Sequence, residues 1–394
     1  MLANKTIVLG VTGGIAAYKA ADLASKLAQA GATVEVVMTE AATKLVAPLT
    51  FRSITGRPVV TNMFKPDSGH SIGHIALADA ADVIVIAPAT ANTIAKITAG
   101  IADNMLTSVV LATTAPVILA PAMHHNMYQN PVTQDNLAKI KARGFDIIEA
   151  GYGRLASGDT GWGRLAGVEK IMGAIQQVLG RKGNLAGKRI VVTAGGTQEP
   201  IDPVRHIGNR SSGKMGHAVA EAARDRGAIV KLITAPTVLP EPPGVEIIRV
   251  QTASQMKEAV TDAVDGTDAL IMAAAVADYQ PESTAKDKIK KESPDLTLEL
   301  IRTPDILAEL KGSFLKVGFA AESSNLIDNA RKKLKAKKLD LIVANDITAA
   351  DSGFDVDTNK VNLIDREGKM EELPLLTKRE VADKILDRVM ELLG

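Results

Sequence analysis

Short runs of β-branched and aliphatic residues alternate with longer alanine-rich stretches along the first half of the chain. Runs of this length predict strands, and the alanine-rich stretches between them predict helices. Apolar strands separated by helices are typical of a parallel sheet covered on both faces. The first strand is followed by a glycine turn at 10–14 and a predicted helix over 15–30, which completes one βαβ unit. The predicted strands of this half cover residues 5–10, 33–39, 82–89 and 116–123.

The same pattern begins again after a polar, glycine-containing stretch at 181–188 (RKGNLAGK), where we place a domain boundary. A hairpin is expected around Glu367–Gly368 because two short alternating runs flank it. Helices are predicted over 168–179, 214–226 and 378–393, and strands over 188–196, 228–234, 268–275, 315–322 and 339–346. A chain of 394 residues suits two domains. We therefore expect an α/β protein with two Rossmann-like domains, residues 1–182 and 188–394.

Composition and charge exclude several classes of function. The chain has 46 basic and 45 acidic side chains, which leaves no net field to attract a nucleic acid. It has no cysteine, so disulfides, thiolate metal sites and a cysteine nucleophile are excluded. Residues 1–5 do not resemble a secretory signal, and no uncharged apolar run reaches the ~18 residues of a membrane span. We expect a cytoplasmic protein with small-molecule partners, and neither nucleic acid nor membrane.

The glycine turn after the first strand is a candidate phosphate site. Gly10, Gly13 and Gly14 expose backbone N–H groups where a helix begins, and a helix dipole favours an anion there. The pattern is not the G-x-G-x-x-G fingerprint, and the second strand ends at Thr39 without the acidic residue that NAD requires. A mononucleotide such as FMN therefore suits the turn better than NAD, and a plain tight turn is the alternative.

Polar residues follow two further strands of the first half. Thr90 and Asn92 come after the third strand, at the sheet edge where open α/β folds bind ligands, although Thr90 could serve only as a helix N-cap. His124, His125 and Asn126 come after the fourth strand. A histidine pair suggests a metal, but no third ligand is evident, so we do not predict a metal site.

Two more features of the first half suggest chemistry. His74 begins a predicted amphipathic helix, and the pKa of a histidine suits proton transfer near neutral pH, with a solvated surface histidine as the alternative. Residues 151–167 (GYGRLASGDTGWGRLAG) hold six glycines, so they are not expected to pack as a core. We expect this segment to form a mobile flap over a site, with an ordinary loop as the alternative.

These motifs stand in the order and spacing of a known family. The glycine turn, SIGHI, APATANTIAKI, GIADN, PAM-x-x-x-MY and GD-x-G-x-GR together resemble the flavin-dependent phosphopantothenoylcysteine decarboxylases. The resemblance implies a flavodoxin-like domain that binds FMN between subunits and assembles as trimers or larger shells. It implies His74 as the base. The implied FMN positions are Gly13, Gly14, Thr39, Thr90 and Asn92.

The family chemistry is oxidation at the cysteinyl carbon–sulfur bond by FMN, loss of CO2 and reduction of the enethiol. Two residues of this chain depart from the family pattern. His124 stands where the family has an asparagine for the substrate carboxylate, and Asn126 lies two residues away. Ser157 stands where most members carry a flap cysteine that protonates or reduces the enethiol. Three alternatives stay open at this position: another donor such as Asp159 or water replaces the thiol, Ser157 is a mutation, or this half of the chain is slow.

A glycine- and serine-rich loop in the second half, GNRSSGK at 208–214, fits the first seven positions of a phosphate-binding P-loop. The eighth position is Met215 rather than Ser or Thr, and DPVRHI precedes the loop instead of a strand. A P-loop ATPase is therefore not expected. Asn209 and Lys214 at a helix start still suit a phosphate or an acyl-phosphate.

Acidic and basic groups follow later strands of the second half. Asp278 ends AAAVADY at a sheet edge, and lysine clusters follow at 286–291 (KDKIKK) and 331–338 (RKKLKAKK). A lysine run is usually a solvated helix face. Two such clusters after sheet edges in one domain favour a triphosphate ligand.

The segments TAGGTQEPIDPVRHIGNRSSGKMG, AAAVADY, KIKK, TPDIL, VGFAAE and AND resemble the phosphopantothenate–cysteine ligases. In that family CTP, with Mg2+ on its phosphates, activates 4'-phosphopantothenate as an acyl-cytidylate, and cysteine displaces CMP. Asn209 matches the asparagine that stabilises the acyl-cytidylate, and Lys288 matches a lysine associated with its formation. The remaining CTP-contacting positions match Ala273, Ala274, Asp278, Pro304, Asp305, Ile306, Phe319, Lys333 and Lys337.

The two halves together resemble bifunctional enzymes of coenzyme A biosynthesis, in which ligation comes first and decarboxylation second. The resemblance implies a homo-oligomer, with a trimer-based shell from the N-terminal half and a dimer from the C-terminal half. The main alternative is an active ligase whose flavin-binding half is mainly an oligomerisation scaffold. An NAD-type oxidoreductase is disfavoured by both glycine loops.

Overall fold

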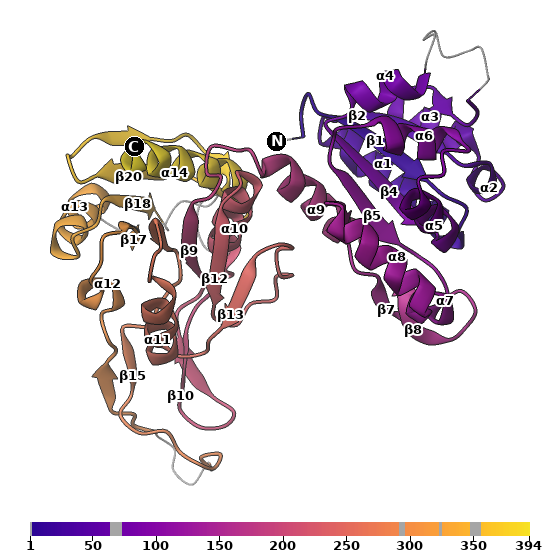
Figure 1. Cartoon of the computed structure of the whole chain (residues 1–394). Coiled ribbons are helices and arrows are strands. Elements are labelled where there is room, and N and C mark those ends of the chain that lie inside the picture. Colours follow the sequence, from indigo (N-terminus) through magenta and orange to yellow (C-terminus); the bar gives the residue numbers. More distant parts are fainter. Residues whose placement is uncertain (1, 64–72, 291–295, 323–324, 347–355) are drawn as a thin grey trace. The chain divides into compact units, whose positions relative to one another are not determined.

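The computed structural model describes residues 2–63, 73–290, 296–322, 325–346 and 356–394. Ser71 and Ile72 of the SIGHI motif lie outside the described residues. The chain divides into two compact units, Met1–Leu179 and Gly180–Gly394, each with its own sheet (Figure 1). Among the described residues, no helix is both long and apolar enough to cross a membrane.

The first unit contains a parallel six-stranded sheet in the order β3-β2-β1-β4-β5-β6. Without the two-residue edge strand β3, the order becomes that of a flavodoxin, 2-1-3-4-5, which confirms the predicted fold of this half. The four predicted strands are all present and correspond to β1, β2, β4 and β5. The strands are β1 (Thr6–Val11), β2 (Thr33–Met38), β3 (Val59–Val60), β4 (Val83–Ala89), β5 (Val117–Pro121) and β6 (Asp146–Ile147).

Helices cover both faces of this sheet because alternate strand residues point to opposite sides. In β1, Ile7 and Leu9 pack with α1, α3 and α9, whereas Val8 packs with α4, α5, α6 and α8. The helix predicted over 15–30 begins as a 3-10 turn, Ile15–Tyr18, before α1. The helices are α1 (Lys19–Gln29), α2 (Glu40–Thr43), α3 (Pro48–Thr55), α4 (Gly73–Ala80), α5 (Ala91–Ala99), α6 (Met105–Ala112), α7 (His125–Gln129), α8 (Pro131–Ala142) and α9 (Val168–Gly180).

The second unit contains an eight-stranded sheet in the order β13-β12-β9-β14-β17-β18-β20-β21. The strands are parallel from β13 to β18, and β20 and β21 form the predicted hairpin at one edge. The strands are β9 (Arg189–Ala194), β12 (Ile229–Thr234), β13 (Glu246–Arg249), β14 (Ala269–Met272), β17 (Leu315–Glu322), β18 (Leu341–Asp346), β20 (Val361–Asp365) and β21 (Met370–Glu372).

Two layers of helices also cover this sheet. Helices α10 (Lys214–Asp225) and α14 (Lys378–Leu393) pack on one face, and their predicted ranges were close to these bounds. On the other face lie α11 (Ala253–Ala263), α12 (Ile306–Glu309) and α13 (Leu326–Ala336).

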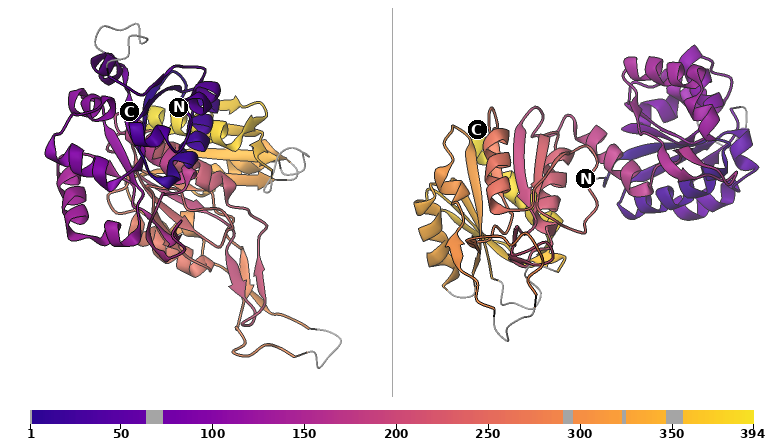
Figure 2. Two further views of the ribbon diagram at one scale, coloured as in Figure 1. Left: turned by 90° about the vertical axis from the view of Figure 1, so that its right-hand side faces the viewer. Right: turned by 90° about the horizontal axis from the view of Figure 1, so that it is seen from below.

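Short ribbons extend from the second unit beyond its sheet (Figures 1 and 2). One pairs β10 with β11 and the other pairs β15 with β16, both antiparallel. A third short pair, β19 with β22, leads into α14. These strands are β10 (Gln198–Pro200), β11 (His206–Gly208), β15 (Tyr279–Pro281), β16 (Leu300–Arg302), β19 (Thr358–Asn359) and β22 (Leu376–Thr377).

Candidate active sites

The carboxyl ends of β1 and β4 form the switch point of the first sheet, where open α/β folds bind ligands. Thr12, directly after β1, is fully buried at this point. Its Oγ1 donates to the Pro88 carbonyl at 2.6 Å and accepts from the Thr90 backbone N–H at 3.0 Å. The hydroxyl thus fixes the two strand ends to each other. Sequence reasoning missed Thr12, although a polar residue at the end of a buried strand was a usable signal.

The two glycines after Thr12 differ in how much space they have. A Cβ on Gly13 would lie 2.3 Å from the Cβ of Ala41, whereas a Cβ on Gly14 would lie 3.4 Å from Thr90 Cγ2. Gly13 is therefore required for the close approach of α2 to the turn. The packing against Ala41 explains a glycine at position 13 without a ligand, so it supports the tight-turn alternative as well as the expected phosphate site.

Thr39 and Thr90 begin helices at the same edge of the sheet. Thr39 caps α2 by accepting from Ala42 N at 3.3 Å, and Thr90 caps α5 by accepting from Thr93 N at 3.4 Å. The N-cap role considered for Thr90 is confirmed, and a hydroxyl that accepts from a helix still has its own proton to donate. Asn92 is exposed in the first turn of α5. The candidate FMN residues thus follow β1, β2 and β4 at one sheet edge.

The glycine-rich segment 151–167 forms an antiparallel ribbon of β7 (Gly151–Arg154) and β8 (Thr160–Arg164). Met123 N donates to Gly163 O at 2.9 Å. A Cβ on Gly163 would lie 2.2 Å from Met123 O, and one on Gly161 would lie 2.8 Å from His125 Cβ. The segment expected to form a mobile flap is thus a two-stranded ribbon, and these two glycines allow its close packing against the β5–α7 connection.

A carboxylate on this ribbon joins two of the predicted site residues. Asp159 Oδ2 lies 3.0 Å from His124 Nε2 and accepts from Ser157 Oγ at 3.0 Å. The hydrogen bond from His124, and to a smaller extent that from Ser157, lowers the pKa of Asp159 below its usual range. His124 Nδ1 accepts from the Asn126 backbone N–H at 3.3 Å. The proton of a neutral His124 is therefore on Nε2, which donates to Asp159.

Asp159 also provides the third candidate metal ligand that the sequence did not reveal. One ligand atom each of His124, His125 and Asp159 lies within 4.8 Å of the others. His125 Nδ1 is buried without a hydrogen-bond partner among the described residues. Coordination by His124 Nε2 would require that nitrogen to lose its proton and Nδ1 to lose its bond from Asn126. With these hydrogen bonds, the group suits a structural link between the ribbon and the β5–α7 connection better than a metal site. We call the hydrogen-bonded pair of His124 and Asp159 the His124 latch.

His74 lies apart from this latch. It is half-buried in the first turn of α4, and Figure 1 shows α4 and the β7–β8 ribbon well separated within the first unit. A single chain therefore does not bring His74 together with His124 and Ser157.

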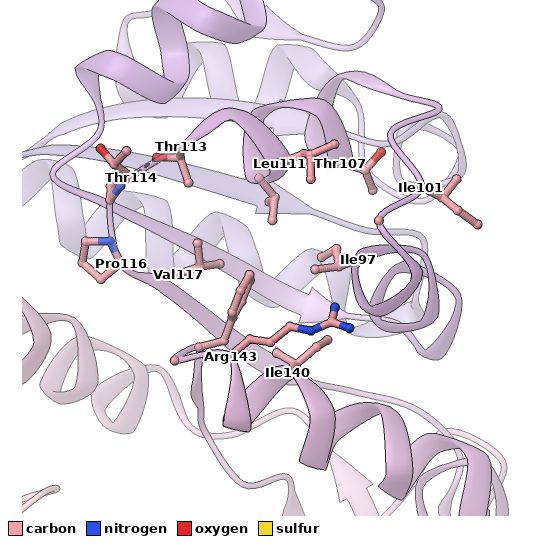
Figure 3. Close-up of a pocket in the computed structure, with 15 residues that line it drawn as sticks. Ile97, Ile101, Thr107, Leu111, Thr113, Thr114, Pro116, Val117, Ile140 and Arg143 are labelled. Atoms are coloured by element: carbon pink, nitrogen blue, oxygen red, sulfur yellow. Dashed lines mark hydrogen bonds between the residues drawn. The ribbon is translucent and has the colours of Figure 1, made fainter.

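A separate groove of about 460 Å3 lies between α5, α6, α8 and the start of β5 (Figure 3). Its walls include the apolar side chains of Ile97, Ile101 and Leu111, together with Arg143. Leu111 is 64% exposed. None of the predicted site residues lines this groove.

In the second unit, a cavity of about 880 Å3 lies beyond the carboxyl ends of β9 and β14, the switch point of this sheet. Ten of the residues predicted for the ligase site line it. They are Asn209, Ala273, Ala274, Asp278, Pro304, Asp305, Ile306, Phe319, Lys333 and Lys337.

Hydrogen bonds fix the segment after β14 in the cavity wall. Thr193 Oγ1 accepts from Ala274 N at 3.1 Å, and the buried Thr197 accepts from Ala277 N at 2.9 Å. Asn209 Nδ2 donates to Val276 O at 2.9 Å, which ties the glycine- and serine-rich loop to this segment. Neither threonine was among the residues predicted for this site.

Lys333 of α13 and Lys337, which directly follows this helix, line the cavity. Lys333 donates to Phe319 O at 2.8 Å, and Lys337 pairs with Asp305 at 3.1 Å. Asp305 also caps α12 by accepting from Ala308 N. The basic run at 331–338 is thus a helix face with some of its lysines in the cavity wall and others outside it.

Lys288 does not line the cavity. It is exposed in a loop held to the β10–β11 ribbon through its neighbour Ile289. Ile289 N donates to Asp202 Oδ2 at 3.1 Å, and Arg205 Nη2 donates to Ile289 O at 2.7 Å. The Arg205 guanidinium beside Asp202 holds the pKa of that buried carboxyl far below its usual range. Sequence reasoning missed this pair, although the D-P-x-R turn was visible.

Comparison with known proteins agrees with the two units. Residues 185–393 match the family model of the DNA/pantothenate metabolism flavoprotein C-terminal domain, and residues 1–180 match the Flavoprotein family model. The coenzyme A biosynthesis bifunctional protein CoaBC of Bacillus subtilis is 48% identical, with 100% of this chain and 98% of that protein covered. Its counterpart in Escherichia coli K12 is 42% identical, with 99% and 97% covered.

The crystal structure of the C-terminal domain of a protein named CoaBC is 43% identical, covers 53% of this chain and 97% of that chain, and has a TM-score of 0.47.

Proposed function

The chain belongs to the coenzyme A biosynthesis bifunctional protein family, and we propose that it makes 4'-phosphopantetheine in two steps. Residues 188–394 would join 4'-phosphopantothenate to cysteine with CTP, and residues 1–182 would then decarboxylate the product with FMN. The observation that carries the proposal is the cavity beyond β9 and β14, which is lined by ten of the residues singled out for a ligase site.

The cavity has the chemistry that acyl activation needs. Lys333 and Lys337 offset triphosphate charge, and Asn209 offers an amide donor near the developing oxyanion. Mg2+ with CTP is part of the proposal. Two carboxylates line the cavity, Asp278 and Asp305, and Mg2+ bound to substrate phosphates commonly takes only one or two protein carboxylates. The ion would neutralise phosphate charge as pyrophosphate leaves.

The residues of the first unit fit FMN. Gly13 and Gly14 have no side chains at the turn, and the hydroxyls of Thr39 and Thr90 lie at the same sheet edge. Bound FMN would supply the oxidation at the cysteinyl carbon. The chain itself would position the substrate, with the His124 latch on the carboxylate side and Ser157 held by Asp159 on the flap ribbon.

We further propose that copies of the chain assemble, as trimers through the first unit and as dimers through the second. The separation of His74 from Ser157 supports a decarboxylase site completed by a second copy. The exposed apolar groove around Leu111 gives such a copy a surface to contact. Lys288 does not line the cavity of its own chain, and in such a dimer it would reach the cavity of the second copy. A cytoplasmic location suits CTP and cysteine as substrates.

The test is product analysis of the purified full chain with 4'-phosphopantothenate, cysteine and either CTP or ATP. We expect pyrophosphate and CMP from CTP, release of CO2, and 4'-phosphopantetheine by mass spectrometry. Ligation without CO2 release would favour the scaffold alternative for the first half. No pyrophosphate with either nucleotide would refute the ligase assignment.

Lys288→Gln should lower the rate of pyrophosphate release on the order of 10²-fold, as expected for loss of one electrostatic donor. Asn209→Asp should still release pyrophosphate but let acyl-cytidylate accumulate or leak. Lys290→Gln is the matched control, an exposed lysine in the same loop, and should act as wild type. Equal rates for Lys288→Gln and Lys290→Gln would contradict the role of Lys288.

A further inference from the structure

The β10–β11 ribbon connects the ligase cavity to the loop that carries Lys288. At the base of the ribbon, the Thr197 backbone N–H and the Asn209 side chain both donate to carbonyls of the segment after β14, at 3.2 Å and 2.9 Å. The antiparallel pairing of β10 with β11 then leads away from the sheet to a turn at 201–205 (Figure 1). Asn209 and the Lys288 loop are therefore held at opposite ends of one ribbon.

A buried carboxylate in this turn holds the Lys288 loop against the ribbon. Asp202 is 3% exposed. Its Oδ1 accepts from the Val204 and Arg205 backbone N–H groups, both at 2.8 Å, and so shapes the turn itself. Its Oδ2 accepts from the Ile289 N–H at 3.1 Å and from Arg205 Nε at 2.9 Å. One carboxylate therefore joins a turn to a loop 87 positions further along the chain.

Two further hydrogen bonds hold the same loop. Ala285 N and Thr284 Oγ1 donate to backbone carbonyls of the ribbon, both at 3.0 Å. We call the contacts of residues 284–289 with residues 200–205 the loop clamp. The bonds to Asp202 are its strongest part, because a charged acceptor roughly doubles the strength of a hydrogen bond.

Lys288 directly precedes Ile289, so the loop clamp fixes its backbone while its side chain is exposed. We propose that Asp202 is a positioning residue of the ligase reaction, which holds the loop that presents Lys288 to the reacting phosphate. The inference rests on the proposed function, in which Lys288 supports formation of the acyl-cytidylate. A lysine on a loose loop would be near the phosphate only part of the time, and a displacement of about 1 Å can cost on the order of 10²-fold in rate.

Asp202→Asn is the test variant, because asparagine keeps the size of aspartate and one of its oxygens. Its amide N–H groups would face the N–H group of Ile289 or those of the turn, so part of the clamp is lost in either orientation. Asp365→Asn is the matched control. Asp365 is also 3% exposed and pairs with Arg388, but it does not line the ligase cavity.

Pyrophosphate release from CTP is measured in the full chain for both variants, for Lys288→Gln, and for Asp202→Asn combined with Lys288→Gln. We expect Asp202→Asn to lower kcat by about 10-fold or more, the size of one charged hydrogen bond, with the KM for CTP within about 2-fold of wild type. In the Lys288→Gln background it should cost less than about 2-fold, because the lysine that it positions is absent. Asp365→Asn should keep the wild-type kcat.

Three outcomes of this cycle would refute the positioning role of Asp202. The first is an unchanged kcat in Asp202→Asn. The second is an equal loss in both backgrounds, which would show that Asp202 does not act through Lys288. The third is a wild-type rate in Lys288→Gln, since there would then be no role for Asp202 to support.

Trypsin gives a second readout that does not depend on turnover. Lys286, Lys288 and Lys290 are exposed, and cleavage after them requires the loop to leave the ribbon. Mass spectrometry of the loop peptides should show cleavage about 10-fold faster in Asp202→Asn than in wild type or Asp365→Asn, and equal cleavage would refute the loop clamp. If wild type releases no pyrophosphate, the proposed function fails, and this readout still tests the clamp.

A second variant avoids the buried carboxylate. Thr284 is exposed, so Thr284→Val removes one bond of the loop clamp without disturbing the interior. If circular dichroism shows that Asp202→Asn does not fold, Thr284→Val takes its place in the cycle and in the proteolysis. We then expect kcat to fall and cleavage to rise by about 2-fold or more, the size of one neutral hydrogen bond. No change in either would refute the inference.

Discussion

Replacement of Thr12 by valine tests whether one hydroxyl holds the flavin edge of the first sheet together. Valine has nearly the same shape but has no oxygen, so the Pro88 carbonyl and the Thr90 N–H both lose their partner. Thr12→Ser keeps the oxygen and loses one methyl group, which makes it the matched control. The comparison isolates the two hydrogen bonds from packing.

The magnitude follows from the burial of these groups. An unsatisfied buried polar group costs about 1–3 kcal/mol, and the half-buried Thr90 N–H falls at the low end because water can reach it. We expect Thr12→Val to lower the free energy of unfolding of the first unit by about 2–4 kcal/mol. Loss of one buried methyl in Thr12→Ser should cost about 1 kcal/mol. With a urea slope of about 2 kcal/mol per M, the midpoints should fall by about 1–2 M and about 0.5 M.

The assay uses a natural probe. Trp162 is the only tryptophan of the chain and lies on β8, so its fluorescence in urea reports the first unit. Unfolding is followed after removal of flavin, since a ligand bound only to the folded state adds stability. Equal midpoints for Thr12→Val and Thr12→Ser would show that the hydroxyl bridge contributes nothing beyond packing. The proposed stabilisation of the switch point by the Thr12 hydroxyl would then be wrong.

Three further predictions concern single positions. Gly13→Ala should abolish the flavin absorbance of the purified protein while Gly14→Ala retains most of it, because only the methyl group at position 13 would clash with the Cβ and backbone of Ala41. Equal flavin content of the two variants would contradict this packing argument. Burial lowers the pKa of His217, so a proton binds this histidine more readily in the unfolded chain than in the folded one. The free energy of unfolding should therefore decline as the pH falls below about 6.5, the ordinary pKa of histidine. His217→Leu should weaken this decline in urea titrations at about pH 7.5 and about pH 5.5, and an unchanged decline would assign it to other groups. Ser157→Cys should speed formation of 4'-phosphopantetheine because a thiol is a stronger acid than a hydroxyl, whereas an unchanged rate would point to another donor such as Asp159.

The sequence by itself determined the elements and the edges at which ligands bind. Period and length of the apolar runs are local properties, so the strands at 33–38 and 229–234 and the helices at 214–225 and 378–393 could be assigned from neighbouring residues alone. Parallel strands place their carboxyl ends at one edge, which brought the candidate residues after those strands to the two switch points.

Only the tertiary structure decided which side chains meet. Thr12 bonds to a carbonyl 76 residues away, and Asp159 joins a histidine 35 residues away; neither pairing has a local pattern. The six glycines of residues 151–167 suggested a mobile segment, because a sequence does not show which atoms pack against a glycine. Lys288 matched a ligase motif, yet its loop is held on a ribbon outside its own cavity, while Lys378 enters that cavity from the far end of the chain. Such contacts join residues that are far apart in the sequence, and the local periodicity of hydrophobic residues does not encode them.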